Sequence, residues 1–219
     1  MSKVDYKNYK IARGEIVKIL KKAEKNSNYR NTGYSFLIEM RKTPNMLVKG
    51  WVSRVINKDG SIDEVIFIDF DGIFFDLMKS ELKYIMKEYN LSPFYIFTSF
   101  EDKKEEGIAG NYLAISLTKR RASTVREILK QTHCDNSYRL VCNSYVYRSW
   151  VTRLSGKGKK KAPKFKCVVG DLSKKYNQDV SQGHLNVMKK IYPEIPHIKY
   201  TNLDEGKDIF LVEYLTASK

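Results

Sequence analysis

The chain has 219 residues, 42% of them hydrophobic, which is enough to bury the core of one large domain or two small ones. Lys and Arg number 40 against 25 Asp and Glu, and the resulting charge of +15 favours a polyanionic partner such as nucleic acid. No apolar run is long enough to span a bilayer, and residues 1–10 lack the apolar core of a secretion signal. The composition therefore argues against a membrane partner.

Four segments repeat apolar residues every three and four positions, as amphipathic helices do. They are residues 11–23, 74–89, 120–131 and 183–192. The first is followed by a polar break, so residues 1–30 are predicted to be a helical accessory segment. In the third, Thr124 and Glu127 fit a capping box.

Strands are predicted where short apolar runs lie between turn signals. The runs are residues 34–40, 50–56, 65–71, 94–99, 112–117, 137–142, 149–155, 165–169 and 208–215. The Asp-Gly pair at residues 59–60 predicts a hairpin turn, and the charged residues 100–110 are predicted to be a loop. Without a repeat or a flexible linker in the sequence, residues 31–219 are predicted to form a single α+β domain, with mixed and antiparallel sheets flanked by helices.

The segment "VIFIDFDG", residues 65–72, is an apolar strand that carries Asp69 and Asp71. Side chains alternate along a strand, so both carboxylates are predicted to point to one side, where each destabilises the other unless a cation binds between them. Mg²⁺ and Mn²⁺ prefer such oxygen ligands. A two-metal site generally needs a further carboxylate, and Asp135 is the candidate. The alternative is a strand end with two solvated aspartates.

Basic residues follow Asp135 and are candidates for binding phosphate. They are Arg139, Arg148, Arg153 and Lys157, with Arg120 and Arg121 as weaker candidates. Residues 157–166 contain six lysines, which are predicted either to bind a nucleic-acid backbone or to form a solvated loop. The aromatic residues Tyr145, Tyr147 and Trp150 are expected to pack on the sheet more readily than to stack on bases.

The cysteines and histidines show no spacing typical of a metal site. Cys134, Cys142 and Cys167 form neither a paired framework nor a C-x-x-C motif, which predicts ordinary thiols in a reducing compartment and a cytoplasmic location. His133, His184 and His197 are predicted to be surface or satisfied core residues.

The order of these motifs resembles the catalytic core of the archaeo-eukaryotic primase superfamily, which includes primase small subunits and primase-polymerases. The resemblance covers about residues 60–170 and implies an RRM-like catalytic core. In that family an hhhDhD strand supplies two metal-binding aspartates, and a later Asp completes the site. By resemblance, Asp69, Asp71 and Asp135 are the catalytic metal ligands for Mg²⁺ or Mn²⁺.

The resemblance also assigns the nucleotide-binding and template-binding residues. The segment "RLSGK" matches the family's basic, phosphate-binding strand through Arg153, Ser155 and Lys157. Where the family has Gly, one residue and then His, this chain has Gly110, Asn111 and Tyr112, so Asn111 and Tyr112 are the expected nucleotide contacts but bring no positive charge. Expected nucleic-acid contacts are Lys159, Lys160, Lys161, Lys164 and Lys166.

The implied function is that of a DNA primase or primase-polymerase. Such a template-directed nucleotidyltransferase uses a single-stranded DNA template, nucleoside triphosphates and two divalent metals, and other replication proteins are conceivable partners. Two rival interpretations remain open. One is a catalytically inactive primase-like subunit that binds nucleic acid. A metal-dependent nuclease is a separate and lesser possibility, because the same metal ions can serve hydrolysis.

The other rival is a haloacid-dehalogenase-type phosphatase. The segment "FIDFDGIFFD", residues 67–76, resembles the first motif of that family. Asp69 would then be the nucleophile and Asp71 the general acid, with Thr98 or Ser99 and Asp171 in the later motifs. Ile73 stands where that family usually has Thr, and about 68 residues precede a motif that normally begins the fold.

Overall fold

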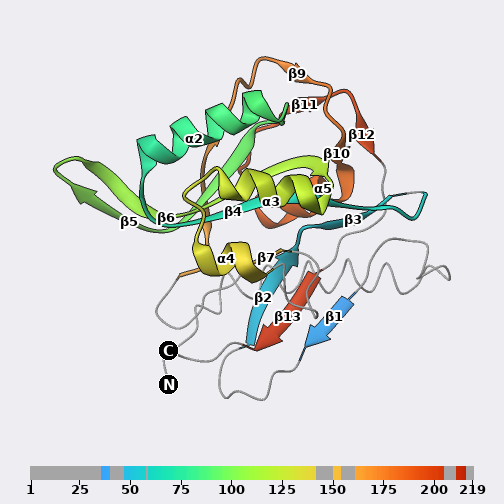
Figure 1. Cartoon of the computed structure of the whole chain (residues 1–219), viewed down its shortest axis with the longest axis horizontal. Coiled ribbons are helices and arrows are strands. Elements are labelled where there is room, and N and C mark those ends of the chain that lie inside the picture. The colour runs from blue at the N-terminus through green and yellow to red at the C-terminus, as the bar shows by residue number, and fades with distance from the viewer. Residues whose placement is uncertain are drawn as a thin grey trace.

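The computed structural model describes residues 36–39, 47–57, 59–141, 150–153, 161–204 and 211–215 (Figure 1). The helix predicted at residues 11–23 and the accessory segment 1–30 lie outside the described residues. The described chain is an α+β fold whose largest sheet is mostly antiparallel, as predicted. No helix of the described part is long and apolar enough to cross a membrane.

The larger sheet has seven strands in the described residues, and three of them are long. Its strands are β3 (Arg54–Ile56), β4 (Ile62–Phe74), β5 (Phe94–Lys104), β6 (Gly107–Arg120), β8 (Lys164–Val169), β10 (Val180–Ser181) and β12 (Leu203–Asp204). β4 and β5 pair antiparallel with the two edges of β6, β3 lies beyond β4, and β8 lies beyond β5. β10 also pairs with β6, and β12 runs parallel to β10.

Two smaller sheets complete the strand inventory of the described residues. The four-stranded sheet has the order β1 (Phe36–Glu39), β13 (Leu211–Leu215), β2 (Leu47–Val52) and β7 (Val151–Arg153). The two-stranded sheet is formed by β9 (Lys175–Tyr176) and β11 (Lys199–Tyr200). The order of the four-stranded sheet brings β13, from the end of the chain, between β1 and β2 (Figure 1).

Ser53 divides the segment that was predicted to be one strand at residues 50–56. Its backbone N–H donates to the carbonyl of Trp150 at 2.9 Å, and the Trp150 N–H donates to its hydroxyl at 3.0 Å. The same hydroxyl donates to the buried carboxylate of Glu64. Because these bonds pull the backbone out of a single ladder, β2 enters the four-stranded sheet and β3 enters the large one.

Four helices lie in the described residues, and three confirm predicted segments. They are α2 (Phe75–Glu88), α3 (Ala122–Lys130), α4 (Asn136–Val141) and α5 (Gln182–Ile191). The capping box predicted at Thr124 is wrong, because the chain enters α3 directly from β6 and no side chain caps its start at Arg121. The strand predicted at residues 137–142 is also wrong, because α4 forms there. The Asp135 carboxylate accepts a hydrogen bond from the Tyr138 N–H at 2.9 Å and so begins a helix.

The loop predicted at residues 100–110 is instead a hairpin. β5 continues to Lys104 and β6 begins at Gly107, with ladder pairs from Phe100–Asn111 to Lys104–Gly107. Figure 1 shows this hairpin extending beyond the body of the fold. The prediction failed because residues 100–106 are exposed on both faces of the hairpin and so show no apolar alternation, although the backbone pairs normally.

Cross-strand partners share a face of a sheet, so the register divides the large sheet into two faces. Asp69 pairs with Leu113, which pairs with Phe97, and these three therefore lie on one face. Its neighbour Phe70 pairs with Tyr112, on the opposite face.

Packing identifies what covers each of these faces. The ring of Phe75 at the start of α2 lies 5.4 Å from that of Tyr112, so α2 covers the Tyr112 face. On the Asp69 face, Tyr192 at the end of α5 packs on Phe97 at 4.5 Å. His184 of α5 lies 6.3 Å from Phe67 and stacks on Trp51 at 5.1 Å. Both faces therefore contribute to the buried core.

Candidate active site

Asp69 and Asp135, far apart in the sequence, are adjacent in the structure. The backbone N–H of Asp135 donates to the carbonyl of Asp69 at 2.8 Å. The Asp135 carbonyl accepts the N–H of Arg139 at 3.0 Å, and its carboxylate accepts that of Tyr138. These bonds attach the start of α4 to β4 and bring together two of the three predicted metal ligands.

Asp71 lies in an irregular part of β4, two residues beyond Asp69. The register with β6 shifts between Phe70 and Ile73, and Gly72 has a φ of 70°, a conformation that glycine adopts without strain. The alternation that predicted both aspartates on one side therefore does not continue undisturbed to Asp71. Asp69 is half-buried, whereas Asp71 is exposed.

Asn111 holds this irregularity in place. Its side-chain oxygen accepts the N–H of Gly72 at 2.9 Å, across from β6 to β4. Asn111 was predicted to be a nucleotide contact. In the structure it lies beside the segment that carries the aspartates, and its side-chain oxygen is bonded to the Gly72 backbone. Sequence reasoning had no signal for the bond, because it joins residues of different strands.

Tyr112, the other predicted nucleotide contact, lies on the face opposite Asp69. It is buried, and its hydroxyl donates to the Glu101 carboxylate at 2.9 Å. Burial, followed by the hydrogen bond and charge of Glu101, raises the pKa of Tyr112 above its ordinary value. The structure therefore does not bring the Tyr112 hydroxyl together with Asp69.

Cys134 is a residue of this site that sequence reasoning treated as an ordinary thiol. It is 4% exposed, and burial raises the pKa of its thiol to about 12. The negative charges of Asp69 and Asp135 raise that pKa further, while a backbone hydrogen bond at Asp69 and the charge of Arg139 lower it. Cys134 is therefore a protonated thiol near both carboxylates, and its position next to Asp135 in the sequence was the available signal.

The acidic residues fit a divalent metal in part. Within the described residues, no group of three His, Cys, Asp or Glu side chains is arranged to hold a metal ion. Mg²⁺, however, keeps several waters and is often bound by one or two carboxylates together with substrate phosphates. Asp69 and Asp135 provide oxygen ligands of the required kind, with Asp71 exposed nearby in the chain.

The predicted basic contacts divide between described and undescribed parts of the chain. Lys164 pairs with Thr98 and thus lies on the α2 face, and the Lys166 ammonium lies 2.7 Å from the Glu101 carboxylate. Lys161 is exposed, and Arg153 belongs to β7. Other residues that were predicted to contact phosphate or bases lie outside the described residues: Ser155, Lys157, Lys159, Lys160, Tyr145, Tyr147 and Arg148.

The weaker candidates Arg120 and Arg121 lie at the other end of β4. Arg120 donates at 2.9 Å to the carbonyls of Tyr89 and Asn90, which end α2. It is the ladder partner of Glu64, five residues before Asp69, which corresponds to roughly 17 Å along a strand. The structure therefore does not bring these arginines to the aspartates.

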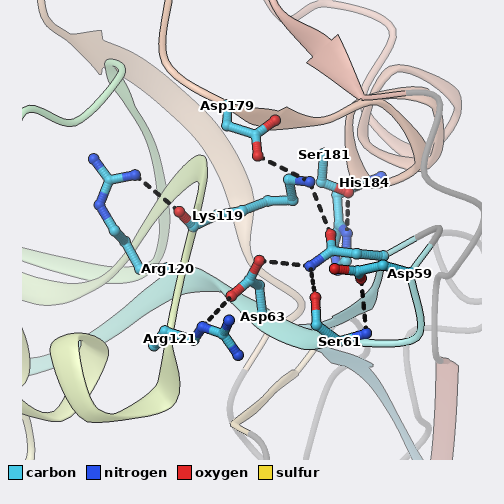
Figure 2. Close-up of polar contacts among 10 residues, drawn as sticks. Asp59, Ser61, Asp63, Lys119, Arg120, Arg121, Asp179, Ser181 and His184 are labelled. Atoms are coloured by element: carbon cyan, nitrogen blue, oxygen red, sulfur yellow. Dashed lines mark hydrogen bonds and ion pairs between the residues drawn. The ribbon is translucent and has the colours of Figure 1, made fainter.

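Figure 2 shows the polar network at that end of β4. The Asp63 carboxylate accepts the amide of Asn57 at 2.7 Å and lies 3.7 Å from the Arg121 guanidinium. The buried Lys119 ammonium donates to Asn57 at 2.9 Å and pairs with Asp179 at 3.1 Å. We call these five residues the polar anchor, because they tie β3, β4, β6 and the segment before β10 together.

The structure confirms the predicted roles of the histidines and of Trp150. His184 is fully buried, its Nε2 donating to the Val52 carbonyl at 2.9 Å while its Nδ1 lies 2.8 Å from the Ser181 hydroxyl. His133 bonds to Glu81 at the surface, and His197 is exposed. The Trp150 ring is buried and so packs in the core.

Thr98 and Asp171, two residues that the rival phosphatase motifs would use, make their hydrogen bonds to groups other than Asp69. Thr98 lies on the α2 face, opposite Asp69, and its hydroxyl donates to the carbonyls of Phe100 and Asn111 at 3.1 and 3.2 Å. The Asp171 carboxylate accepts the N–H and the hydroxyl of Ser173 within its own turn.

Comparison of the sequence with protein-family models, with curated proteins and with solved structures found no match. The resemblance to the primase superfamily therefore rests on the motifs of the sequence alone.

Proposed function

We propose that this chain is a template-directed nucleotidyltransferase of the primase-polymerase type, which joins nucleotides on single-stranded DNA. The observation that carries the proposal is the hydrogen bond between the Asp135 N–H and the Asp69 carbonyl. This bond brings Asp69, of the first motif, next to Asp135, of the third, and the resemblance implies that these two residues share a metal site. The excess of basic residues supports a polyanionic substrate.

The reaction is attack of a primer 3′-hydroxyl, or the hydroxyl of a first nucleotide, on the α-phosphate of a nucleoside triphosphate, with release of pyrophosphate. Bound Mg²⁺ or Mn²⁺ supplies the charge that activates the hydroxyl and stabilises the leaving oxygen. Asp69 and Asp135 would hold the metal, and Asp71 would add a carboxylate. The buried part of β4 and the attached start of α4 fix the backbones of Asp69 and Asp135, and such positioning is the main contribution of a protein to this chemistry.

Charge on the triphosphate must be balanced by residues other than Tyr112, because its hydroxyl is neutral and bonded to Glu101. Arg153, Ser155 and Lys157 remain the proposed triphosphate contacts. Lys159, Lys160 and Lys161 remain proposed contacts to the template.

The direct test is incorporation of labelled nucleotides on a single-stranded template, with and without a primer, in Mg²⁺, in Mn²⁺ and in a chelator. We expect product only with metal, and a loss of at least 100-fold in Asp71→Asn, about 2.7 kcal/mol of transition-state stabilisation. Hydrolysis of p-nitrophenyl phosphate serves as the parallel assay. Metal-dependent hydrolysis without incorporation would replace the proposal with the phosphatase, and template binding without either activity would replace it with the inactive module.

A further inference from the structure

Two lysines from different elements converge on one aromatic ring on the α2 face. The ammonium of Lys79 in α2 lies 4.8 Å from the centre of the Phe75 ring, and that of Lys166 in β8 lies 4.6 Å from it. Lys164 lies on the same face, two residues before Lys166. Acidic partners are present, since Asp76 lies 2.6 Å from Lys79 and Glu101 lies 2.7 Å from Lys166.

α2 extends this group of positive charges along its exposed side. Lys83 and Lys87 follow Lys79 at intervals of four residues and are exposed. Each interval is about one helical turn, so the three side chains leave the helix at steps of roughly 6 Å along its axis. Tyr84 lies beside this row and is 57% exposed.

Like charges four residues apart destabilise a helix, and within this row the Asp76 carboxylate pairs with Lys79, the first of the three. The repulsion disappears when an anion with regularly spaced charges lies along the row. A nucleic-acid backbone has this property, and an exposed aromatic ring beside a basic track is typical of surfaces that bind single strands. We propose that Lys79, Lys83, Lys87, Lys164 and Lys166, here called the α2 lysine surface, bind single-stranded DNA, with Tyr84 stacking on a base.

This surface goes beyond the proposed chemistry, because it lies on the face of the sheet opposite Asp69. It rests on the proposed function only in the choice of single-stranded DNA as occupant. The α2 lysine surface thus holds the template at a distance from the reacting end.

Binding of a fluorescent single-stranded oligonucleotide tests the proposal, measured by anisotropy in a chelator at several salt concentrations. The variant is Lys79→Gln, Lys83→Gln and Lys87→Gln together. The matched control is Lys130→Gln, Lys189→Gln and Lys190→Gln, which removes three charges from exposed positions of α3 and α5. Circular dichroism verifies that each variant is folded, and Tyr84→Ala provides a second test that leaves the charge unchanged.

We expect the α2 variant to bind at least tenfold more weakly and to lower the salt slope by about 2, because each contact to a single strand contributes about 0.7. The control should stay within twofold, and Tyr84→Ala should lose roughly fivefold or more. Equal losses in variant and control would overturn the proposal, since net charge alone would explain them. Absence of binding by the unaltered protein would also overturn it, and binding to phosphatidylserine vesicles instead would identify a membrane surface. The assay contains no metal and no nucleoside triphosphate, so the measured affinity does not depend on whether the protein catalyses nucleotide incorporation.

Discussion

The two ends of β4 both carry acidic residues but differ in how these residues are held. At the first end, side chains surround Asp63 and Glu64: Asn57 and Arg121 contact the former, and the Ser53 hydroxyl contacts the latter. At the second end, Asp69 is tied to Asp135 through the backbone, and the strand is irregular at Gly72. The first arrangement stabilises the fold through side chains, whereas in the second a backbone hydrogen bond brings Asp69 and Asp135 together.

A carboxylate on a buried strand is therefore not by itself a sign of a functional site. Glu64 is 1% exposed and Asp71 is exposed, although both belong to the same strand. Substitutions at the first end should therefore change stability, and substitutions at the second end should change activity.

The largest expected effect is at Asp135, which has two roles that different substitutions separate. Asp135→Asn keeps an oxygen that can accept the Tyr138 N–H, whereas Asp135→Ala removes it. Both should lower nucleotide incorporation at least 100-fold, and only Ala should also lose about 1 kcal/mol of stability as a lost helix cap. Incorporation rates and urea unfolding measure the two effects, and an active Asp135→Asn protein would remove Asp135 from the site.

Gly110→Ala tests the close strand packing near the aspartate segment. A Cβ at Gly110 would lie 2.5 Å from the backbone oxygen of Phe100 and 3.0 Å from the Tyr112 ring. We expect a loss of about 3 kcal/mol on unfolding in urea, as for an overpacked core. Gly60→Ala is the control, because its φ is 81° but nothing lies within 4 Å, so it should cost only about 1 kcal/mol. Equal costs would contradict the close approach.

His184 makes stability depend on pH. Burial lowers its pKa from 6.5 to about 4, the Val52 carbonyl opposing this change, so the folded state holds a neutral ring. Below pH 6.5 the unfolded chain binds more protons at this residue, and stability falls by about 2 kcal/mol between pH 7.5 and pH 5. Urea unfolding at both pH values should show this loss, and His184→Gln should lack it. The same pH dependence in His184→Gln would show that other groups cause it.

The smallest expected effect is that of Arg120→Gln. The change removes a guanidinium from the carbonyls that end α2, although Gln retains one amide donor, and should cost about 1 kcal/mol in thermal or urea unfolding. Nucleotide incorporation by the folded variant should be unchanged. A selective loss of incorporation would place Arg120 at the phosphates, contrary to its position in the structure.

Local patterns predicted the elements that have a clear apolar period, such as α2 and the central strands. They failed at residues 137–142, because the Asp135 cap competes with strand-like composition, and at residues 100–110, because the hairpin is exposed on both faces. For the candidate site, the order of motifs predicted that Asp69 and Asp135 come together. The bond from Asn111 to Gly72 and the position of Tyr112 on the opposite face depend on strand register, which a sequence pattern does not specify.

A matched pair of variants, Asp69→Asn and Asp63→Asn, compares the two ends of β4 in one experiment. Nucleotide incorporation on a primed single-stranded template in Mn²⁺ and the midpoint of thermal unfolding are measured for both. We predict that Asp69→Asn loses at least 100-fold in incorporation with an unchanged midpoint, while Asp63→Asn keeps its activity and unfolds at a lower temperature because the polar anchor is weakened. An Asp69→Asn protein as active as the unaltered chain would contradict the assignment of the second end of β4 as the active site.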